Sequence, residues 1–306
     1  GSSIMKKIII IGAGAISKKH ISVIKKQNYK IELNNISSRK FEKYSKSDLK
    51  KLAFLKPELI IVCSPSSKHF DHFKKIEENF KNTKVLIEKP IFEKYYNIKK
   101  KLRNKYYVGY NLRFHPVIGF LKKFLINKKI FSINVISHSY LPDWRKIDYK
   151  KSVSAVKKLG GGVLLELSHE LDYLKWIFKD IKILYSFNKK ISKLNINTDD
   201  ALSLIGKVKK NTLLNLNLNF FSKILNRTIK IDGDNFSLNA DLIKNEIMIM
   251  NNNNKQFKKF LNFNIKDTYK LQFSEIMDGN FSKICTLQQG LELMKLIEVI
   301  KKKSKK

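Results

Sequence analysis

The stretch Ile8-Ile9-Ile10-Ile11-Gly12-Ala13-Gly14-Ala15-Ile16-Ser17 decides the fold of the first part of this chain. A continuous apolar run that ends in glycine predicts a short strand buried on both faces. The glycines permit a tight turn into a helix, and backbone N–H groups at such a helix N-terminus bind a dinucleotide pyrophosphate. Ser17 replaces the third glycine of that pattern, so the segment also fits an ordinary strand-to-helix turn. The cofactor-binding candidates here are Gly12, Ala13, Gly14, Ala15 and Ile16.

Outward from this turn, strand and helix signals alternate over about the first 115 residues. Apolar runs at 7–11, 59–63, 85–87 and 106–110 and an extended stretch at 29–37 alternate with helical stretches at 17–27 and 69–79. Short apolar strands joined by crossover helices predict an α/β domain with a doubly wound parallel sheet.

Beyond Arg113 the pattern changes to strands that follow one another. Strand-like stretches lie at 131–140, 201–207, 213–221, 229–231 and 247–250, with a helical insert at 162–178 and a closing helix at about 287–302. This predicts an α+β domain with a large, mostly antiparallel open sheet. Since 306 residues exceed one usual core, we expect two domains, at 5–117 and 118–306.

The net charge of +36 suggests nucleic acid or an anionic membrane as a partner. Arginine, the residue that reads bases best, occurs only at positions 39, 103, 113, 145 and 227, so the charge comes from scattered lysines. We therefore expect no nucleic-acid partner. The charge should still concentrate anionic small molecules such as phosphorylated cofactors and nucleotide sugars.

Cysteine content and hydropathy indicate the compartment. Cys63 and Cys285 are too few for a disulfide framework or a four-thiolate zinc site and fit a reducing environment. The apolar start of the chain is interpreted as a strand and not as a signal peptide, and no later stretch is long and apolar enough to span a membrane. We expect a cytoplasmic protein without a membrane partner.

Four residues occupy the place where an NAD enzyme carries the acid that binds the ribose diol. Ser37-Ser38-Arg39-Lys40 offers hydroxyl groups and two cations there. Because these groups suit a 2′-phosphate, Ser38 and Arg39 predict that NADP(H) is preferred and NAD(H) is possible. A basic turn in a lysine-rich chain is the alternative.

Two further segments carry groups for proton transfer. Glu88-Lys89-Pro90 follows an apolar strand, at the edge where open α/β sheets bind ligands, and Lys89 can donate to a reacting hydroxyl or carbonyl. Gly160-Gly161-Gly162 precedes Glu166, His169 and Asp172 at i, i+3 spacing, where a carboxylate fixes the histidine tautomer. A surface turn and a structural histidine are the alternatives. No cluster of cysteine and histidine supplies a metal site.

Taken in order, these features resemble the glucose-fructose oxidoreductase and inositol dehydrogenase family, often written Gfo/Idh/MocA. The resemblance rests on the glycine turn with His20 after it, on Cys63-Ser64-Pro65-Ser66-Ser67-Lys68-His69, on Glu88-Lys89-Pro90, on Gly109-Tyr110-Asn111-Leu112-Arg113-Phe114-His115-Pro116, and on the triple glycine before Glu166 and His169. It implies a Rossmann domain, hydride transfer at a sugar or polyol carbon, and a homodimer or homotetramer built through the second sheet.

The resemblance also assigns roles to residues. Lys89 and His169 match the family's catalytic lysine and acid/base, and Pro90 would follow a cis peptide bond. Glu166 stands one residue closer to the histidine than the family's usual aspartate, which puts its relay role in doubt. Cys63, Ser64, Pro65, His69 and Glu88 would join the cofactor site. Arg113 and Asp172 would contact substrate.

A closer similarity is to the branch associated with bacterial surface polysaccharides. It rests on Tyr140-Leu141-Pro142-Asp143-Trp144-Arg145 and on the string Ser168-His169-Glu170-Leu171-Asp172. By this resemblance the substrate is a sugar or nucleotide sugar, contacted by Tyr140, Trp144 and Arg145. We therefore expect an NAD(P)-dependent sugar oxidoreductase. The alternative is a catalytically idle dinucleotide-binding or sensor protein.

Overall fold

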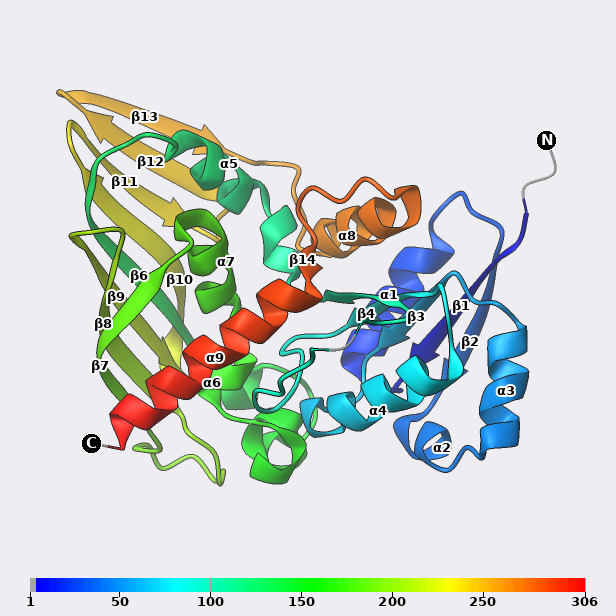
Figure 1. Ribbon diagram of the computed structural model, residues 1–306. Coiled ribbons are helices and arrows are strands. Elements are labelled where there is room, and N and C mark those ends of the chain that lie inside the picture. Colours follow the sequence, from blue (N-terminus) through cyan, green and yellow to red (C-terminus); the bar gives the residue numbers. More distant parts are fainter. Residues whose placement is uncertain (1–3, 100, 306) are drawn as a thin grey trace. The chain divides into compact units, whose positions relative to one another are not determined.

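The computed structural model describes residues 4–99 and 101–305 (Figure 1). The chain forms two compact units. The first holds the described residues up to Asn111 together with Ile265–Met294, and the second holds Leu112–Asn264 together with the chain from Lys295.

The first unit is built on a six-stranded sheet in the order β14-β5-β4-β3-β1-β2. Five strands are parallel, and they are β1 (Lys6–Ile11), β2 (Ile31–Ile36), β3 (Leu59–Val62), β4 (Lys84–Ile87) and β5 (Lys105–Val108). The edge strand β14 (Cys285–Thr286) is antiparallel to β5. The isoleucines at 8–11 are at most 1% exposed, as expected for a strand covered on both faces.

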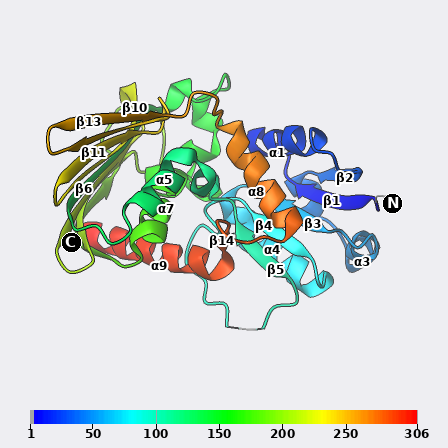
Figure 2. The ribbon, with the colours of Figure 1, turned by 90° about the horizontal axis from the view of Figure 1, so that it is seen from above.

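Helices cover both faces of this sheet. α1 (Ala15–Lys25) and α8 (Lys266–Asp278) pack together on one face, and α3 (Lys46–Phe54) and α4 (Ser66–Asn79) lie on the other (Figure 2). The short α2 (Ser38–Glu42) follows β2 directly. The start of α3 is stabilised by local hydrogen bonds, because Ser45 and Asp48 form a reciprocal capping box there.

The second unit is built on an eight-stranded sheet in the order β13-β12-β11-β10-β6-β9-β8-β7. Only the β6–β9 pair is parallel among the described strands of this sheet. The strands are β6 (Ile130–Tyr140), β7 (Ile181–Lys189), β8 (Ala201–Val208), β9 (Thr212–Asn219), β10 (Phe221–Gly233), β11 (Phe236–Asp241), β12 (Glu246–Asn251) and β13 (Asn254–Lys259).

The helices of the second unit lie on one face of its sheet (Figure 1). They are α5 (Pro116–Phe124), α6 (Val163–Glu166), α7 (His169–Phe178) and the last part of α9 (Leu287–Ser304). Short 3-10 turns at Asn111–Phe114, Leu141–Asp143, Tyr149–Lys151, Val153–Ala155 and Lys157–Leu159 make up much of the connections. The other face exposes large side chains of the β7 edge, including Tyr185 at 74% and Phe187 at 46%.

The fold class expected from the sequence is confirmed: a doubly wound parallel sheet is followed by a mostly antiparallel one. Two details differ. The single helix expected at 162–178 is broken into α6 and α7 at Leu167 and Ser168. Residues 265–294, expected in the second domain, pack with the first unit because β14 pairs with β5 and α8 packs on α1.

Candidate functional site

The glycine turn has two glycines with different constraints. Gly12 has φ +123°, and a Cβ there would lie 2.8 Å from the carbonyl carbon and oxygen of Cys63. Gly14 is the N-cap of α1 with φ −84°, and a Cβ there would meet nothing within 4 Å. The turn therefore leaves open space at the N-terminus of α1, where backbone N–H groups bind phosphate.

Two polar side chains hold this turn in shape. The buried Ser17 hydroxyl donates to the carbonyl oxygen of Gly14 at 2.7 Å, so the residue that replaces the third glycine is accommodated by a hydrogen bond. Asn35, in β2, donates from Nδ2 to the carbonyl oxygens of Gly12 at 2.8 Å and Ile10 at 3.2 Å. Asn35 was not predicted as a site residue, because nothing in the sequence pattern distinguishes it from its neighbour Asn34.

The candidate phosphate-binding residues lie at the same edge of the sheet as the glycine turn. Ile36 ends β2 beside Ile11, which ends β1, and the chain passes directly into α2. Ser37 caps α2, because its hydroxyl accepts the backbone N–H of Lys40 at 3.2 Å. The side chain of Arg39 is exposed and that of Ser38 half-buried. The Arg39 guanidinium and the Ser38 hydroxyl thus follow β2, the strand next to β1, which leads into the glycine turn.

The segment after β3 carries two buried histidines. His69 faces the carbonyl oxygen of Ser64 with Nε2 at 2.7 Å, and His72 faces the Ser64 hydroxyl with Nδ1 at 2.8 Å. Burial lowers the pKa of both, to about 4 for His72. Cys63 is buried, and burial raises the pKa of its thiol, so it is no reactive nucleophile.

The loop at 88–90, which carries Lys89, follows β4 at the same edge of the sheet. Ile87, the last residue of β4, pairs with Val62, the last residue of β3. The Lys89–Pro90 peptide bond is cis, as the family resemblance implied. Lys89 is half-buried, whereas Glu88 is 6% exposed and contacts His20 of α1. The first unit therefore brings the glycine turn, Arg39 and Lys89 to the carboxyl edge of one sheet, which is where open α/β folds bind ligands.

In the second unit, Glu166 ends α6 and His169 begins α7, and both are half-buried. The glycines before α6 allow other backbone segments to approach closely. A Cβ on Gly161 would clash with the carbonyl oxygens of Val153 and Ser154. A Cβ on Gly162, where φ is +110°, would clash with the Asp199 carboxylate. That carboxylate accepts the Leu164 N–H at 3.0 Å and so caps α6.

Arg113 and Asp172, expected to contact substrate, contact each other. Nε and Nη2 of Arg113 donate to the two carboxylate oxygens of Asp172, each at 2.9 Å, and both residues are at most 3% exposed. The guanidinium also lies over the ring of Trp176, 5.2 Å from its centroid. This bidentate pair orients α7, which begins with His169, and the two side chains present little surface to a ligand.

The three remaining substrate candidates lie at the end of β6 and after it. Trp144 Nε1 donates to the Ser139 hydroxyl at 2.9 Å, and its ring meets Phe220 edge-on at 5.2 Å. Arg145 is exposed, and Tyr140 is half-buried in β6. Trp144 and Arg145 line a small hollow with Leu141 and Tyr149. Trp144 is thus a fixed aromatic surface beside a solvated cation.

A second buried ion pair of the second unit was not anticipated. Arg227, in β10, donates from Nη2 and Nε to the carboxylate of Glu170 at 2.6 and 3.1 Å, and Glu170 is fully buried. Glu170 follows His169 directly, so the pair ties the first turn of α7 to the sheet. The two residues are 57 positions apart, and no local pattern indicates the contact.

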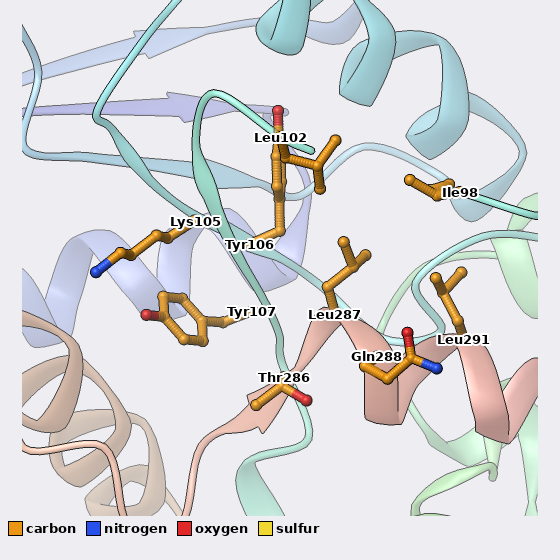
Figure 3. Close-up of a pocket in the computed structure, with 9 residues that line it drawn as sticks. All are labelled: Ile98, Leu102, Lys105, Tyr106, Tyr107, Thr286, Leu287, Gln288 and Leu291. Atoms are coloured by element: carbon orange, nitrogen blue, oxygen red, sulfur yellow. The ribbon is translucent and has the colours of Figure 1, made fainter. Parts of the chain in front are cut away.

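A cavity of about 400 Å³ lies at the β14 and β5 side of the first unit (Figure 3). Figure 3 shows Tyr107 reaching out from β5 and Leu287 and Leu291 from α9; Ile98, Leu102 and Tyr106 also line it. Within residues 4–99 and 101–305, no group of three or more His, Cys, Asp or Glu could hold a metal ion. No helix in that same part of the chain has the length and apolar character to cross a membrane.

Residues 6–109 match the family GFO_IDH_MocA, described as an oxidoreductase family with an NAD-binding Rossmann fold. No curated protein matches the chain.

Several solved structures share the fold over nearly the whole chain. The WlbA dehydrogenase from Bordetella pertussis, in complex with NADH and UDP-GlcNAcA, is 16% identical, with 98% of this chain and 96% of that chain covered and a TM-score of 0.73. A levoglucosan dehydrogenase in complex with NADH is 12% identical, with 98% and 97% covered and a TM-score of 0.80. The transcriptional regulator Gal80p from Kluyveromyces lactis is 14% identical, with 100% and 93% covered and a TM-score of 0.78.

At these identities the structures show a shared fold, and the family match rests on residues 6–109. Those residues contain the glycine turn, Arg39 and the cis Lys89–Pro90 bond. Residues 6–109 are therefore similar to the Gfo/Idh/MocA oxidoreductase family, described by its NAD-binding Rossmann fold.

Proposed function

We propose that this protein is an NAD(P)-dependent oxidoreductase that transfers hydride between nicotinamide and a carbon of a sugar, nucleotide sugar or polyol. The observation that carries the proposal is the carboxyl edge of the first sheet, where the glycine turn, Arg39 and Lys89 follow β1, β2 and β4. The WlbA structure, which holds NADH and UDP-GlcNAcA on the same fold, supports a nucleotide sugar as the substrate class.

The residues of this edge fit a dinucleotide. Gly14 leaves open the space that a Cβ would fill at the N-terminus of α1, and the backbone N–H groups there suit a pyrophosphate. Gly12 to Ile16 would bind it, and Ser38 and Arg39 would bind a 2′-phosphate, which favours NADP(H) over NAD(H). Cys63, Ser64, Pro65 and Glu88 border the same edge. When bound, nicotinamide supplies or accepts the hydride.

The chain itself would hold and move the proton. Lys89 Nζ donates to the reacting hydroxyl or carbonyl oxygen, and His169 acts as acid or base in the second unit. Glu166, three residues before His169, orients its ring. Tyr140, Trp144 and Arg145 contact the sugar or its anionic group, whereas Arg113 and Asp172 act by orienting α7.

The exposed face of the second sheet supports a homodimer or homotetramer. Tyr185 and Phe187 lie in register with Ile205 and Ser203 of β8, and Tyr185, Phe187 and Ile205 are all exposed, so these side chains share the solvent-facing side of the sheet. A patch of large apolar side chains on one face is typical of a subunit interface. We further propose that the protein works in the cytoplasm on small molecules.

A sensor that binds the cofactor without turnover is the second candidate function. The fold of Gal80p, a transcriptional regulator, favours it, and so does the shortened spacing between Glu166 and His169. The two functions differ in one observable, which is turnover.

The test is a panel of UDP-sugars, free sugars and polyols incubated with NADP⁺ or NAD⁺ and followed by nicotinamide absorbance. The oxidoreductase account expects reduction of the cofactor with at least one nucleotide sugar. It also expects Lys89→Met to lower turnover by about a hundredfold or more while cofactor affinity stays within about threefold. Binding of cofactor with no turnover across the panel favours the sensor. Full turnover by Lys89→Met removes Lys89 from the mechanism.

A further inference from the structure

Two buried histidines from different helices hold the loop that carries Lys89. His20 lies on α1, which follows the glycine turn, and His69 lies on α4, on the other face of the sheet. They are 2% and 1% exposed. His20 contacts the residue before Lys89, and His69 contacts the two residues after it.

On the first side, the contact passes through Glu88. Nε2 of His20 lies 2.7 Å from Oε1 of Glu88, and Oε2 of Glu88 accepts the backbone N–H of Lys89 at 3.3 Å. Gly109, just after β5, makes room for this carboxylate, because a Cβ there would lie 2.7 Å from Oε2. The position of Glu88, and through it the amide of Lys89, therefore depends on His20 and Gly109.

On the second side, the contact is to the backbone. Nδ1 of His69 lies 3.0 Å from the carbonyl oxygens of both Pro90 and Ile91, and Nε2 lies 2.7 Å from that of Ser64. Carbonyl oxygens only accept, so whichever ring nitrogen carries a proton donates to the backbone. His69 thus joins the segment after β3 to the residues that follow Lys89.

We propose that His20, His69 and Gly109 are positioning residues that fix the backbone on both sides of Lys89 and thereby set where its amine points. The inference rests on the proposed function of Lys89 in proton transfer. A lysine side chain has many rotamers, so its amine reaches one place reproducibly only when its backbone is held. The three residues act through Glu88, Pro90 and Ile91 and need no contact with a substrate.

The experiment compares purified full-length variants without added ligand. The variants are His20→Leu, His20→Gln, His69→Leu, His69→Gln and Gly109→Ala. The matched control is His115→Leu, which removes a buried histidine of the second unit that caps α5. Two quantities are measured by mass spectrometry of peptides: amide hydrogen exchange over 86–93, and the rate at which acetic anhydride labels Lys89.

The two Leu variants at His20 and His69, and Gly109→Ala, should speed exchange in this peptide by about tenfold or more and change the labelling rate of Lys89 by a factor of about three or more. The two Gln variants keep an N–H donor and should stay within about threefold of the unsubstituted protein in both measurements. His115→Leu should leave the peptide unchanged.

The proposal is overturned if both Leu variants leave exchange and labelling unchanged, or if His115→Leu raises exchange over 86–93 as much as they do. If a Leu variant does not fold, the other Leu variant and Gly109→Ala carry the test, and unchanged exchange and labelling in both of these overturns the proposal. Failure of the unsubstituted protein to bind NADPH or NADH would reject the proposed function while the loop measurement still stands, so the two failures are distinguishable.

Discussion

The Cα of Gly12 packs against the carbonyl group of Cys63 so closely that a Cβ would lie 2.8 Å from both of its atoms. Gly12 also has φ +123°, a conformation that strains any other residue. Gly14, two residues later, has neither constraint. One glycine is therefore required by the fold, and the packing of the protein itself does not require the other.

Gly14→Ala should leave the protein folded and weaken cofactor binding. The added methyl meets no protein atom within 4 Å but fills the space at the N-terminus of α1. We expect an unfolding midpoint within about 2 °C of the unsubstituted protein and a loss of NADPH affinity of about tenfold or more. Calorimetric titration with NADPH measures the affinity.

The control is Gly12→Ala, which should destabilise the fold by about 2 kcal/mol or more, since it combines strained backbone with a clash against Cys63. Unchanged NADPH binding by Gly14→Ala would show that the dinucleotide does not use this turn.

Arg39→Ala should weaken NADPH binding and spare NADH. The guanidinium is exposed at the start of α2, next to Ser38. Loss of one charge-assisted contact to a 2′-phosphate is expected to cost about tenfold in affinity, or on the order of 1–2 kcal/mol. Parallel titrations with the two cofactors measure the effect.

Lys43→Ala is the matched control, because it removes one positive charge from the other end of the same helix. Equal losses of NADPH affinity in the two variants would mean that the affinity depends on the overall positive charge of the protein and not on Arg39 in particular.

Arg113→Ala should unfold the second unit more readily. It leaves the Asp172 carboxylate buried without the bidentate partner seen here. Breaking a buried pair in this way costs about 3–5 kcal/mol, whereas Arg145→Ala, at an exposed position, should cost less than about 0.5 kcal/mol. Urea unfolding measures both. A stable Arg113→Ala protein with impaired turnover would return Arg113 to the substrate site.

Acid should destabilise the protein through two buried histidines. Burial lowers the pKa of His72 and His115 from 6.5 to about 4. Between these values the unfolded chain binds protons that the folded chain does not, so stability falls as the pH drops from 6.5 to 4. The loss is on the order of 3 kcal/mol for each histidine.

The unfolding midpoint, followed across this pH range, should therefore decrease on acidification, and His115→Gln should flatten part of the decrease. A midpoint that is constant between pH 6.5 and pH 4 would contradict the assignment of these histidines as neutral in the folded protein.

The sequence predicted the first sheet well because its evidence is local. The strands at 6–11 and 59–62 contain continuous apolar runs, and the glycine turn predicts the helix that follows it. β14 was missed because two residues give no periodicity. α8 was not predicted as a helix, and residues 265–294 were expected in the second domain because only tertiary packing, such as that of α8 on α1, assigns them to the first unit. The break between α6 and α7 was also missed, because neither glycine nor proline marks Leu167 and Ser168 in the sequence.

The candidate site divides in the same way. Lys89 and its cis bond to Pro90 were expected from an ordered set of motifs, and the structure confirms the cis bond. The partners of Arg113 and Glu170 were not expected, because ion pairs between residues 57 or 59 positions apart follow from tertiary packing alone. The roles of individual site residues stay predictions.

Cofactor binding is measured first, by a fluorescence titration of the unsubstituted protein with NADPH and with NADH, at physiological salt so that the +36 charge is screened. We expect saturable binding of both cofactors, with NADPH bound more tightly by about tenfold or more. Equal binding, or tighter binding of NADH, would keep the oxidoreductase and overturn the role of Arg39. Absence of binding by either cofactor would contradict the account.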